Sequence, residues 1–177
     1  MNCRYYLVMA LLSGLMLCTR PLETTGVTET GTVVTGNLVT ASGTPVSASL
    51  VKLVPADFDP LKDAQRVRTY ADTTDSAGSY AFHAVPLGAY TVLSVNIRER
   101  TRAMTGGVNV DAGEDTVAAP VDTLRIPGAI KMTVSDIFDT TNGYVYIPGT
   151  FNFVRLRGAG HIVVLDSVPA GTIASVA

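Results

Sequence analysis

The sequence predicts an all-β protein folded as a β-sandwich, and three features of the chain support this expectation. From Thr32 onward, short β-branched runs are separated by Gly, Pro, Asn and Asp. No stretch keeps a helical period of apolar residues. Hydrophobic residues make up 47 % of the 177 residues, which is enough to build a packed core and excludes a disordered chain.

Five short runs are expected to form the first strands, with turn residues at 42–45 and 75–78. These runs are residues 32–41, 46–55, 67–71, 79–84 and 89–97. Their regular spacing is typical of a sandwich. Tyr80 and Phe82 alternate with Ala81 and His83, so the aromatic pair is expected to face the core and His83 the solvent.

Two segments of this region carry a recurring pattern of turn and strand residues, GNLVTASGTPVSASLVKLVP at 36–55 and TTDSAGSYAFHAVPLGAYTV at 73–92. They resemble a known family, the carboxypeptidase-regulatory-like or transthyretin-like (Cna-B-like) sandwich. The positions that fit the family pattern are Gly36, Gly43, Pro45, Val46, Asp75, Gly78, Tyr80, Phe82, Val85, Pro86, Gly88 and Tyr90. The sequence departs from the pattern at Asn37-Leu38 and Ser49. The resemblance implies a Greek-key sandwich over 32–126, closed by a hairpin of 107–113 and 116–125 that turns at Gly113.

Residues 127–177 are interpreted as a second, diverged copy of the sandwich. The segment VPLGAY at 85–90 recurs as VPAGTI at 168–173, and the same offset matches Tyr80 and Phe82 with Val163 and Leu165. Ala177 then corresponds to Ser94, which leaves the copy without a closing hairpin. Truncation, a smaller natural unit and an edge that accepts a strand from another chain all remain open explanations.

The N-terminal 18 residues are predicted to be an export signal. Arg4 precedes the uncharged run 7–17, which is too short to span a bilayer comfortably, and Cys18 follows it. This arrangement resembles the lipoprotein signal, which implies a lipid on Cys18, although Leu17 stands where that family usually has Gly, Ala or Ser. An uncleaved anchor, or cleavage elsewhere, is the alternative. Residues 19–31 are rich in Thr, Glu and Gly and are predicted to be a flexible linker.

No catalytic residues, metal ligands or cofactor are predicted. The two histidines, His83 and His161, lack the spacing of a zinc site, and no nucleophile elbow or phosphate-binding loop is present. The acidic loop 57–63 is interpreted as a solvated turn rather than a calcium site. A net charge of −2 gives no electrostatic attraction to nucleic acid.

The densest aromatic cluster is the best candidate for ligand binding. Its members are Tyr144, Tyr146, Phe151 and Phe153. Tyr144 and Tyr146 are expected to share one strand face, and Phe151 and Phe153 another, so all four could equally belong to the core.

These features together predict a non-enzymatic lipoprotein of the bacterial cell envelope, placed at the outer membrane. It would act as a stalk or display module, with the membrane and an envelope protein or glycan as partners. A carbohydrate-binding accessory module is the alternative, and a secreted or periplasmic location is the alternative to the membrane.

Overall fold

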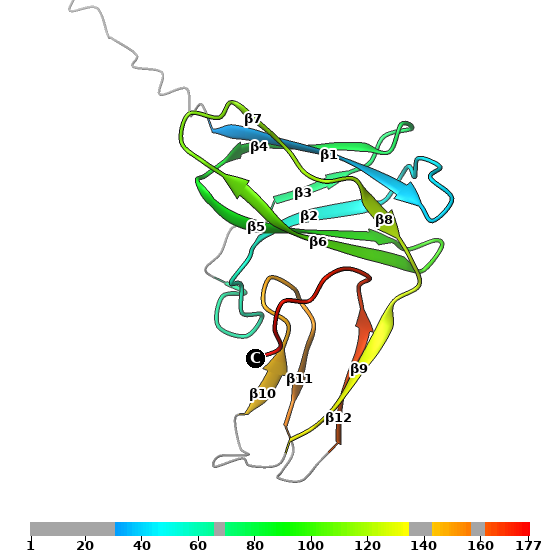
Figure 1. Ribbon diagram of the computed structural model, residues 1–177, viewed down its shortest axis with the longest axis vertical. Helices are drawn as coiled ribbons and strands as arrows, with labels where there is room; N and C mark the ends of the chain where they lie inside the picture. The colour runs from blue at the N-terminus through cyan, green and yellow to red at the C-terminus, as the bar shows by residue number, and fades with distance from the viewer. Residues whose placement is uncertain (1–30, 66–69, 135–142, 157–161) are drawn as a thin grey trace, which may run out of the picture.

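The computed structural model describes residues 31–65, 70–134, 143–156 and 162–177, and these contain strands and turns without a helix (Figure 1). The predicted all-β sandwich is confirmed. The strands are β1 Thr32–Thr40, β2 Leu50–Pro55, β3 Tyr70–Thr73, β4 Ser79–Val85, β5 Gly88–Asn96, β6 Thr101–Val110, β7 Thr116–Ala118, β8 Asp122–Leu124, β9 Gly128–Thr133, β10 Tyr144–Tyr146, β11 Phe153–Arg155 and β12 Ile162–Val168. None of the described segments is a helix long and apolar enough to cross a membrane.

Two four-stranded sheets form the first sandwich. One has the order β4-β1-β7 with β8 also on β1, and the other has the order β3-β2-β5-β6. Tyr80 and Phe82 point into the core between the sheets, where their rings lie 5.5 Å apart, and His83 is exposed, as the alternation predicted. The core is lined by alternate residues of both sheets, including Val34, Val51 and Val92, which are fully buried.

The predicted closing hairpin is wrong. The chain forms the long strand β6 and then crosses to the other sheet, where β7 and β8 both run parallel to β1. The crossing is fixed by backbone hydrogen bonds from Val33 N to Asp115 O, 2.9 Å, and from Ala119 N to Thr35 O, 2.8 Å. β7 therefore pairs with the free edge of β1. The turn at Gly113 leads the chain from one sheet to the other and does not join neighbouring strands of one sheet.

Two predicted strand boundaries also differ from the structure. Residues 46–49 lie outside β2 because Thr74 binds them: its Oγ1 donates to Val46 O at 2.7 Å and accepts from Ser49 N at 3.0 Å. The strand expected at 67–71 is β3, four residues ending at Thr73, and residues 66–69 lie outside the described part of the chain.

The C-terminal half consists of two antiparallel ribbons, β9–β12 and β10–β11. Ile147, Leu165 and Val168 form their shared core, with Ile130, Met132, Val145 and Val154 partly buried around it. In Figure 1 this half lies below the first sandwich, so that the molecule is elongated and the start of β1 lies at the opposite end from β10 and β11.

The two halves are joined by apolar packing and hydrogen bonds. Phe58 is buried with Val54, Leu93 and Met104 on the outer face of the second sheet, and Ile173 packs against this cluster and against the core of the C-terminal half. Hydrogen bonds run from Met104 N to Ala170 O and from Gly149 N to Phe58 O. Because these contacts come from several segments of each half, we expect the two halves to move as one body.

The β9–β12 ribbon has the same pairing as β1–β4. In β1–β4, Thr32 pairs with Val85 and Val34 with Phe82, with a register shift between the two pairs. In β9–β12, Gly128 pairs with Val168 and Ile130 with Leu165, with the shift in the same place. The burial of β12 also matches that of β4 at the three core positions, Val163, Leu165 and Val168.

Several sequence-based expectations fall outside the described residues. These are the signal at 1–18 with its lipidation site Cys18, the linker at 19–31 apart from its last residue, and His161.

A candidate ligand-binding face on the β10–β11 hairpin

Three of the four candidate aromatic residues share one face of the β10–β11 hairpin. Tyr146 pairs directly with Phe153, and Tyr144 is two residues along the same strand. Residues opposite one another in an antiparallel ladder lie on the same face, and alternate residues do as well. Val145 and Val154, the pair between them, pack against the core. The aromatic side chains therefore point away from that core, and the interpretation as core residues does not hold for this face.

The exposed aromatic surface is centred on Tyr146 and Phe153. Phe153 has 41 % of its surface exposed and Tyr146 is half-buried. The rings of Tyr144 and Tyr146 lie 5.5 Å apart at an interplanar angle of 39°. Neighbouring rings with open faces can stack against the apolar face of a flat or ring-shaped ligand.

Phe151 does not belong to this face. It lies in the turn between β10 and β11, where its ring meets that of Phe58 edge-on at 5.1 Å and carries the Lys52 Nζ at 4.9 Å from its centroid. The prediction that Phe151 and Phe153 share a face is wrong, because the turn ends one residue before β11 begins. Phe151 contributes to the junction between the halves.

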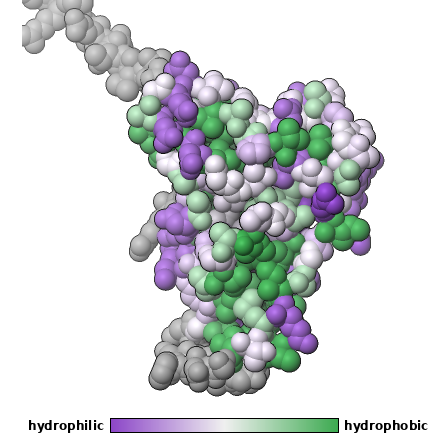
Figure 2. Space-filling model, in the orientation of Figure 1, coloured by the Kyte–Doolittle hydropathy of each residue, from purple (hydrophilic) through white to green (hydrophobic). Residues whose placement is uncertain are grey.

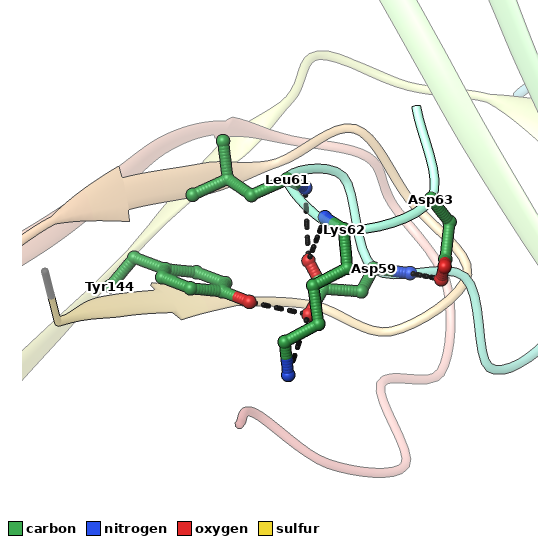
Figure 3. Close-up of polar contacts among 5 residues, drawn as sticks. All are labelled: Asp59, Leu61, Lys62, Asp63 and Tyr144. Carbon is green, nitrogen blue, oxygen red and sulfur yellow. Dashed lines mark hydrogen bonds and ion pairs between the residues drawn. The ribbon is translucent and has the colours of Figure 1, made fainter. Parts of the chain in front are cut away.

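The polar end of Tyr144 is held by the loop that follows β2. Its hydroxyl donates a 2.5 Å hydrogen bond to Asp59 Oδ2 (Figure 3). Asp59 is 4 % exposed, and its Oδ1 accepts hydrogen bonds from the backbone N–H groups of Leu61 and Lys62 at 2.9 and 3.2 Å. The expectation of a solvated acidic turn is therefore wrong at Asp59, which organises the loop and ties it to β10.

The charge state of this pair is set by its own contacts. Burial raises the pKa of Asp59, but the hydrogen bonds from Tyr144, Leu61 and Lys62 favour the carboxylate and leave the pKa below its usual value. The hydrogen bond to Asp59 raises the pKa of Tyr144 to about 12. At neutral pH the phenol thus remains a donor and the carboxylate an acceptor, so the pair holds the edge of the aromatic face in place.

A cleft of about 520 Å³ lies between β6 and residues 170–174. Asp122 and Arg125 line it, together with Thr105 and the backbone of Gly106 and Gly107. Burial raises the pKa of Asp122, although hydrogen bonds from Thr105 and Ser94 oppose the shift. Because Ser94, Thr105 and the Thr123 N–H already engage this carboxylate, its contacts are those of a residue that joins the two sheets.

Sequence reasoning missed Asp59 and Asp122 as structurally engaged carboxylates. The motif Asp59-Pro60-Leu61-Lys62 carries a local signal for Asp59, since Asp commonly accepts hydrogen bonds from the backbone two and three residues on. Asp122 has no comparable local signal. Among the residues that the structure describes, no group of three His, Cys, Asp or Glu side chains could hold a metal ion.

No protein family and no curated protein matches the sequence. Similar solved structures include a Pseudomonas aeruginosa protein with a proposed carbohydrate-binding role, 21 % identical over 51 % of this chain and 88 % of that chain, with a TM-score of 0.33. The major pilin SpaD of Corynebacterium diphtheriae is 20 % identical over 60 % of this chain, with a TM-score of 0.37, and this chain covers 32 % of its length. A minor pilin of Streptococcus agalactiae is 13 % identical over 80 % of each chain, with a TM-score of 0.35.

Proposed function

We propose that this protein is a non-enzymatic display module of the bacterial cell envelope, attached through a lipid on Cys18. The observation that carries the proposal is the placement of the start of β1 at one end of the elongated body and of the C-terminal half at the other (Figure 1). An anchor that precedes β1 would hold the first sandwich near the membrane and present the C-terminal half away from it. The apolar junction at Phe58 would keep the two halves aligned.

Lipid attachment is tested by replacing each of the two cysteines. Cys18→Ala is expected to abolish the lipid mass of the purified protein and its partition into detergent, because the anchor would be that side chain. Cys3→Ala is the matched control, since Cys3 lies in the segment that export would remove and its loss should leave both properties unchanged. A wild-type protein cleaved elsewhere, without lipid and freely soluble, would refute the anchor.

Carbohydrate binding is the second candidate, and the outward-facing aromatic residues favour it. Tyr146 and Phe153 pair across the hairpin and point away from the core, with Phe153 well exposed. Aromatic side chains expose flat apolar surfaces of the kind that sugar rings stack on. The proposed envelope location and this binding face are compatible, because a display module can carry a glycan-binding surface on its C-terminal half.

A further inference from the structure

The β9–β12 ribbon resembles β1–β4 in the residues that face each other across the strands as well as in register. Gly36 lies opposite Tyr80, and a Cβ on Gly36 would lie 2.1 Å from the Tyr80 hydroxyl oxygen. At the corresponding place Met132 lies opposite Val163. A small residue facing a large one is thus replaced by a larger residue facing a smaller one, and Val163 keeps the buried position of Tyr80. The β9–β12 ribbon therefore corresponds to the β1–β4 pair of the first sandwich.

In the first sandwich, the other edge of β1 is covered by a parallel strand. Val33 and Thr35 pair with Thr116 and Ala118 of β7, and hydrogen bonds join Val33 N to Asp115 O and Ala119 N to Thr35 O. Alternate residues of a strand bond to opposite neighbours, so the residues between them, such as Val34, bond to β4. Both edges of β1 are satisfied.

The corresponding edge of β9 has no partner within the described residues. β9 pairs with β12 alone, and its register puts Ile130 and Met132 in the positions of Val34 and Gly36. Ala129 and Lys131 then correspond to Val33 and Thr35, which bond to β7 in the first sandwich, and Thr133 lies further along the same edge. Their backbone N–H and C=O groups face the free edge, and an unpaired edge of this kind is a template for another strand.

Apolar side chains on both faces of the β9–β12 ribbon are incompletely covered. Ile162 and Val164 of β12 are 58 % and 47 % exposed. Ile130 and Met132, which point to the inner face, are only partly buried against the core. Figure 2 shows apolar side chains gathered over much of the visible face of the C-terminal half. In the first sandwich the equivalent inner positions are fully covered, with Val34 at 0 % exposure.

We propose that the free edge of β9 is a docking site for an extended segment of another polypeptide chain. By analogy with β7, this segment runs parallel to β9, directs an apolar side chain inward beside Ile130, and carries an acidic residue opposite Lys131. The inward side chain is inferred from Val117, which packs against the core opposite Val34. The acidic residue is inferred from the charge of Lys131, which lies at the centre of the edge and is exposed.

A second copy of this chain fits the edge less well. Two β9 strands paired antiparallel, in the register that uses all three edge residues, would place Lys131 directly opposite Lys131 of the other copy. Like charges in that position are destabilising. The charge of the edge therefore selects a different chain.

The test uses the full chain with a stand-in strand appended after Ala177 through a Gly/Ser linker, which raises its local concentration to the order of millimolar. The appended strand repeats residues 114–120, EDTVAAP, with glutamate at the position of Ala118. One matched control has lysine at that position, and another has the glutamate version in scrambled order. Backbone hydrogen exchange is measured for Ala129 and Lys131, with Ile130 and the core residues of β1 as internal references.

We expect exchange at Ala129 and Lys131 to slow by about tenfold or more with the glutamate strand, less with the lysine strand, and not at all with the scrambled strand. Unchanged exchange with the glutamate strand would overturn the proposal. Slow exchange at these residues in the unextended chain at all concentrations would also overturn it, because the edge would then already be covered. Exchange that slows with rising protein concentration would overturn it as well, because the partner would then be a second copy. The inference rests on the proposed display role only in naming another chain as the partner. Amide exchange at the β9 edge is measured on purified protein and does not depend on whether Cys18 carries a lipid.

Discussion

Ala84 and Ser167 have the same left-handed backbone conformation, with φ values of 54° and 56°, and each precedes the buried valine that ends its strand. Gly88 and Gly171, four residues further on in each case, also match, at 151° and 154°. Side chains with a Cβ rarely adopt these values. The ends of β4 and β12 therefore share one bulged backbone geometry, which costs free energy at both places.

Replacing either strained residue by glycine is expected to stabilise the protein. A non-glycine residue in the left-handed region costs about 1–2 kcal/mol, and the added freedom of glycine in the unfolded chain offsets about 0.5–1 kcal/mol of that gain. Ala84→Gly and Ser167→Gly should therefore each raise the free energy of unfolding by up to about 1 kcal/mol, measured by chemical denaturation. Ala81→Gly, in the regular part of β4, should lower it by about 0.5–1 kcal/mol. A gain at Ala84 alone would mean that the two strand ends are not equivalent.

Adding a methyl group at Gly36 is expected to destabilise the first sandwich. The new Cβ would overlap the ring of Tyr80, which is buried and cannot swing aside. Overpacking of this kind costs typically about 1–3 kcal/mol, to be read from the midpoint of denaturation. The matched control is Gly106→Ala in β6, where nothing lies within 4 Å of the added Cβ and the backbone is not left-handed. Equal effects of the two substitutions would contradict the close approach of Tyr80 to β1.

More of the first sandwich than of the C-terminal half could be predicted, because short stretches of its sequence determine its strands and their buried faces. The alternation around Tyr80 and Phe82 and the turn residues at 75–78 determine a strand and its buried face without reference to the rest of the chain. The place of β7 could not be predicted this way, because three residues on a polar background do not specify which of two sheets they join. That choice depends on the free edge of β1, which exists only after the sandwich has formed.

Prediction of the candidate site from the sequence was limited in the same way, by contacts that form only in the folded chain. Four aromatic residues within ten positions marked the hairpin, but their orientation was ambiguous from spacing. The structure resolves it through Val145 and Val154, which face the core and force Tyr144, Tyr146 and Phe153 outward. The hydrogen bond between Tyr144 and Asp59 joins residues 85 positions apart, and no sequence pattern connects them.

Loss of the Asp59 carboxylate is expected to return the pKa of Tyr144 from about 12 toward its ordinary value near 10. In Asp59→Asn the hydrogen bond to a charged acceptor and its negative field are removed, so the largest cause of the raised pKa is lost, while burial still disfavours the phenolate. The titration is followed by NMR of the labelled Tyr144 ring, with Asp57→Asn, an exposed carboxylate of the same loop, as the control. A wild-type Tyr144 that already titrates near its ordinary value would show that the contact is absent in solution.

The same pair predicts two pH limits for the attachment of β10 to the loop. Because the pKa of Asp59 is lowered on folding, its contribution to stability is present above the ordinary pKa of 3.8 and is lost as pH falls through the lowered value. Because the pKa of Tyr144 is raised on folding, its contribution is present below pH 10 and is lost as pH rises through about 12. In Asp59→Asn the acid slope should be lost and the alkaline slope should become smaller, because burial alone still raises the pKa of Tyr144. Unchanged slopes would contradict the assignment.

Removal of the Phe58 side chain is expected to separate the two halves energetically. Phe58 is 1 % exposed and contacts the outer face of β2, β5 and β6, so Phe58→Ala should cost about 3–5 kcal/mol. The C-terminal half, which has the smaller core, should then unfold first and give two calorimetric transitions. Leu87→Ala is the control, because Leu87 is 62 % exposed and its loss should change stability by about 0.5 kcal/mol or less. A single transition at lower temperature would mean that the remaining hydrogen bonds suffice to couple the halves.

If the aromatic face binds a glycan, the affinity should depend on Tyr146 and Phe153 and should not depend on Phe151. Tyr146→Ala and Phe153→Ala each remove one ring of the outward face, and loss of a stacking contact of about 1 kcal/mol corresponds to roughly fivefold weaker binding. Phe151→Ala removes a residue of equal size and similar exposure, 43 %, whose ring packs against Phe58 instead. Affinities measured by calorimetry against soluble oligosaccharides of envelope polysaccharides would separate these variants. Equal losses for all three would assign the effect to the stability of the hairpin, and no binding by the wild type would leave display without glycan recognition as the function.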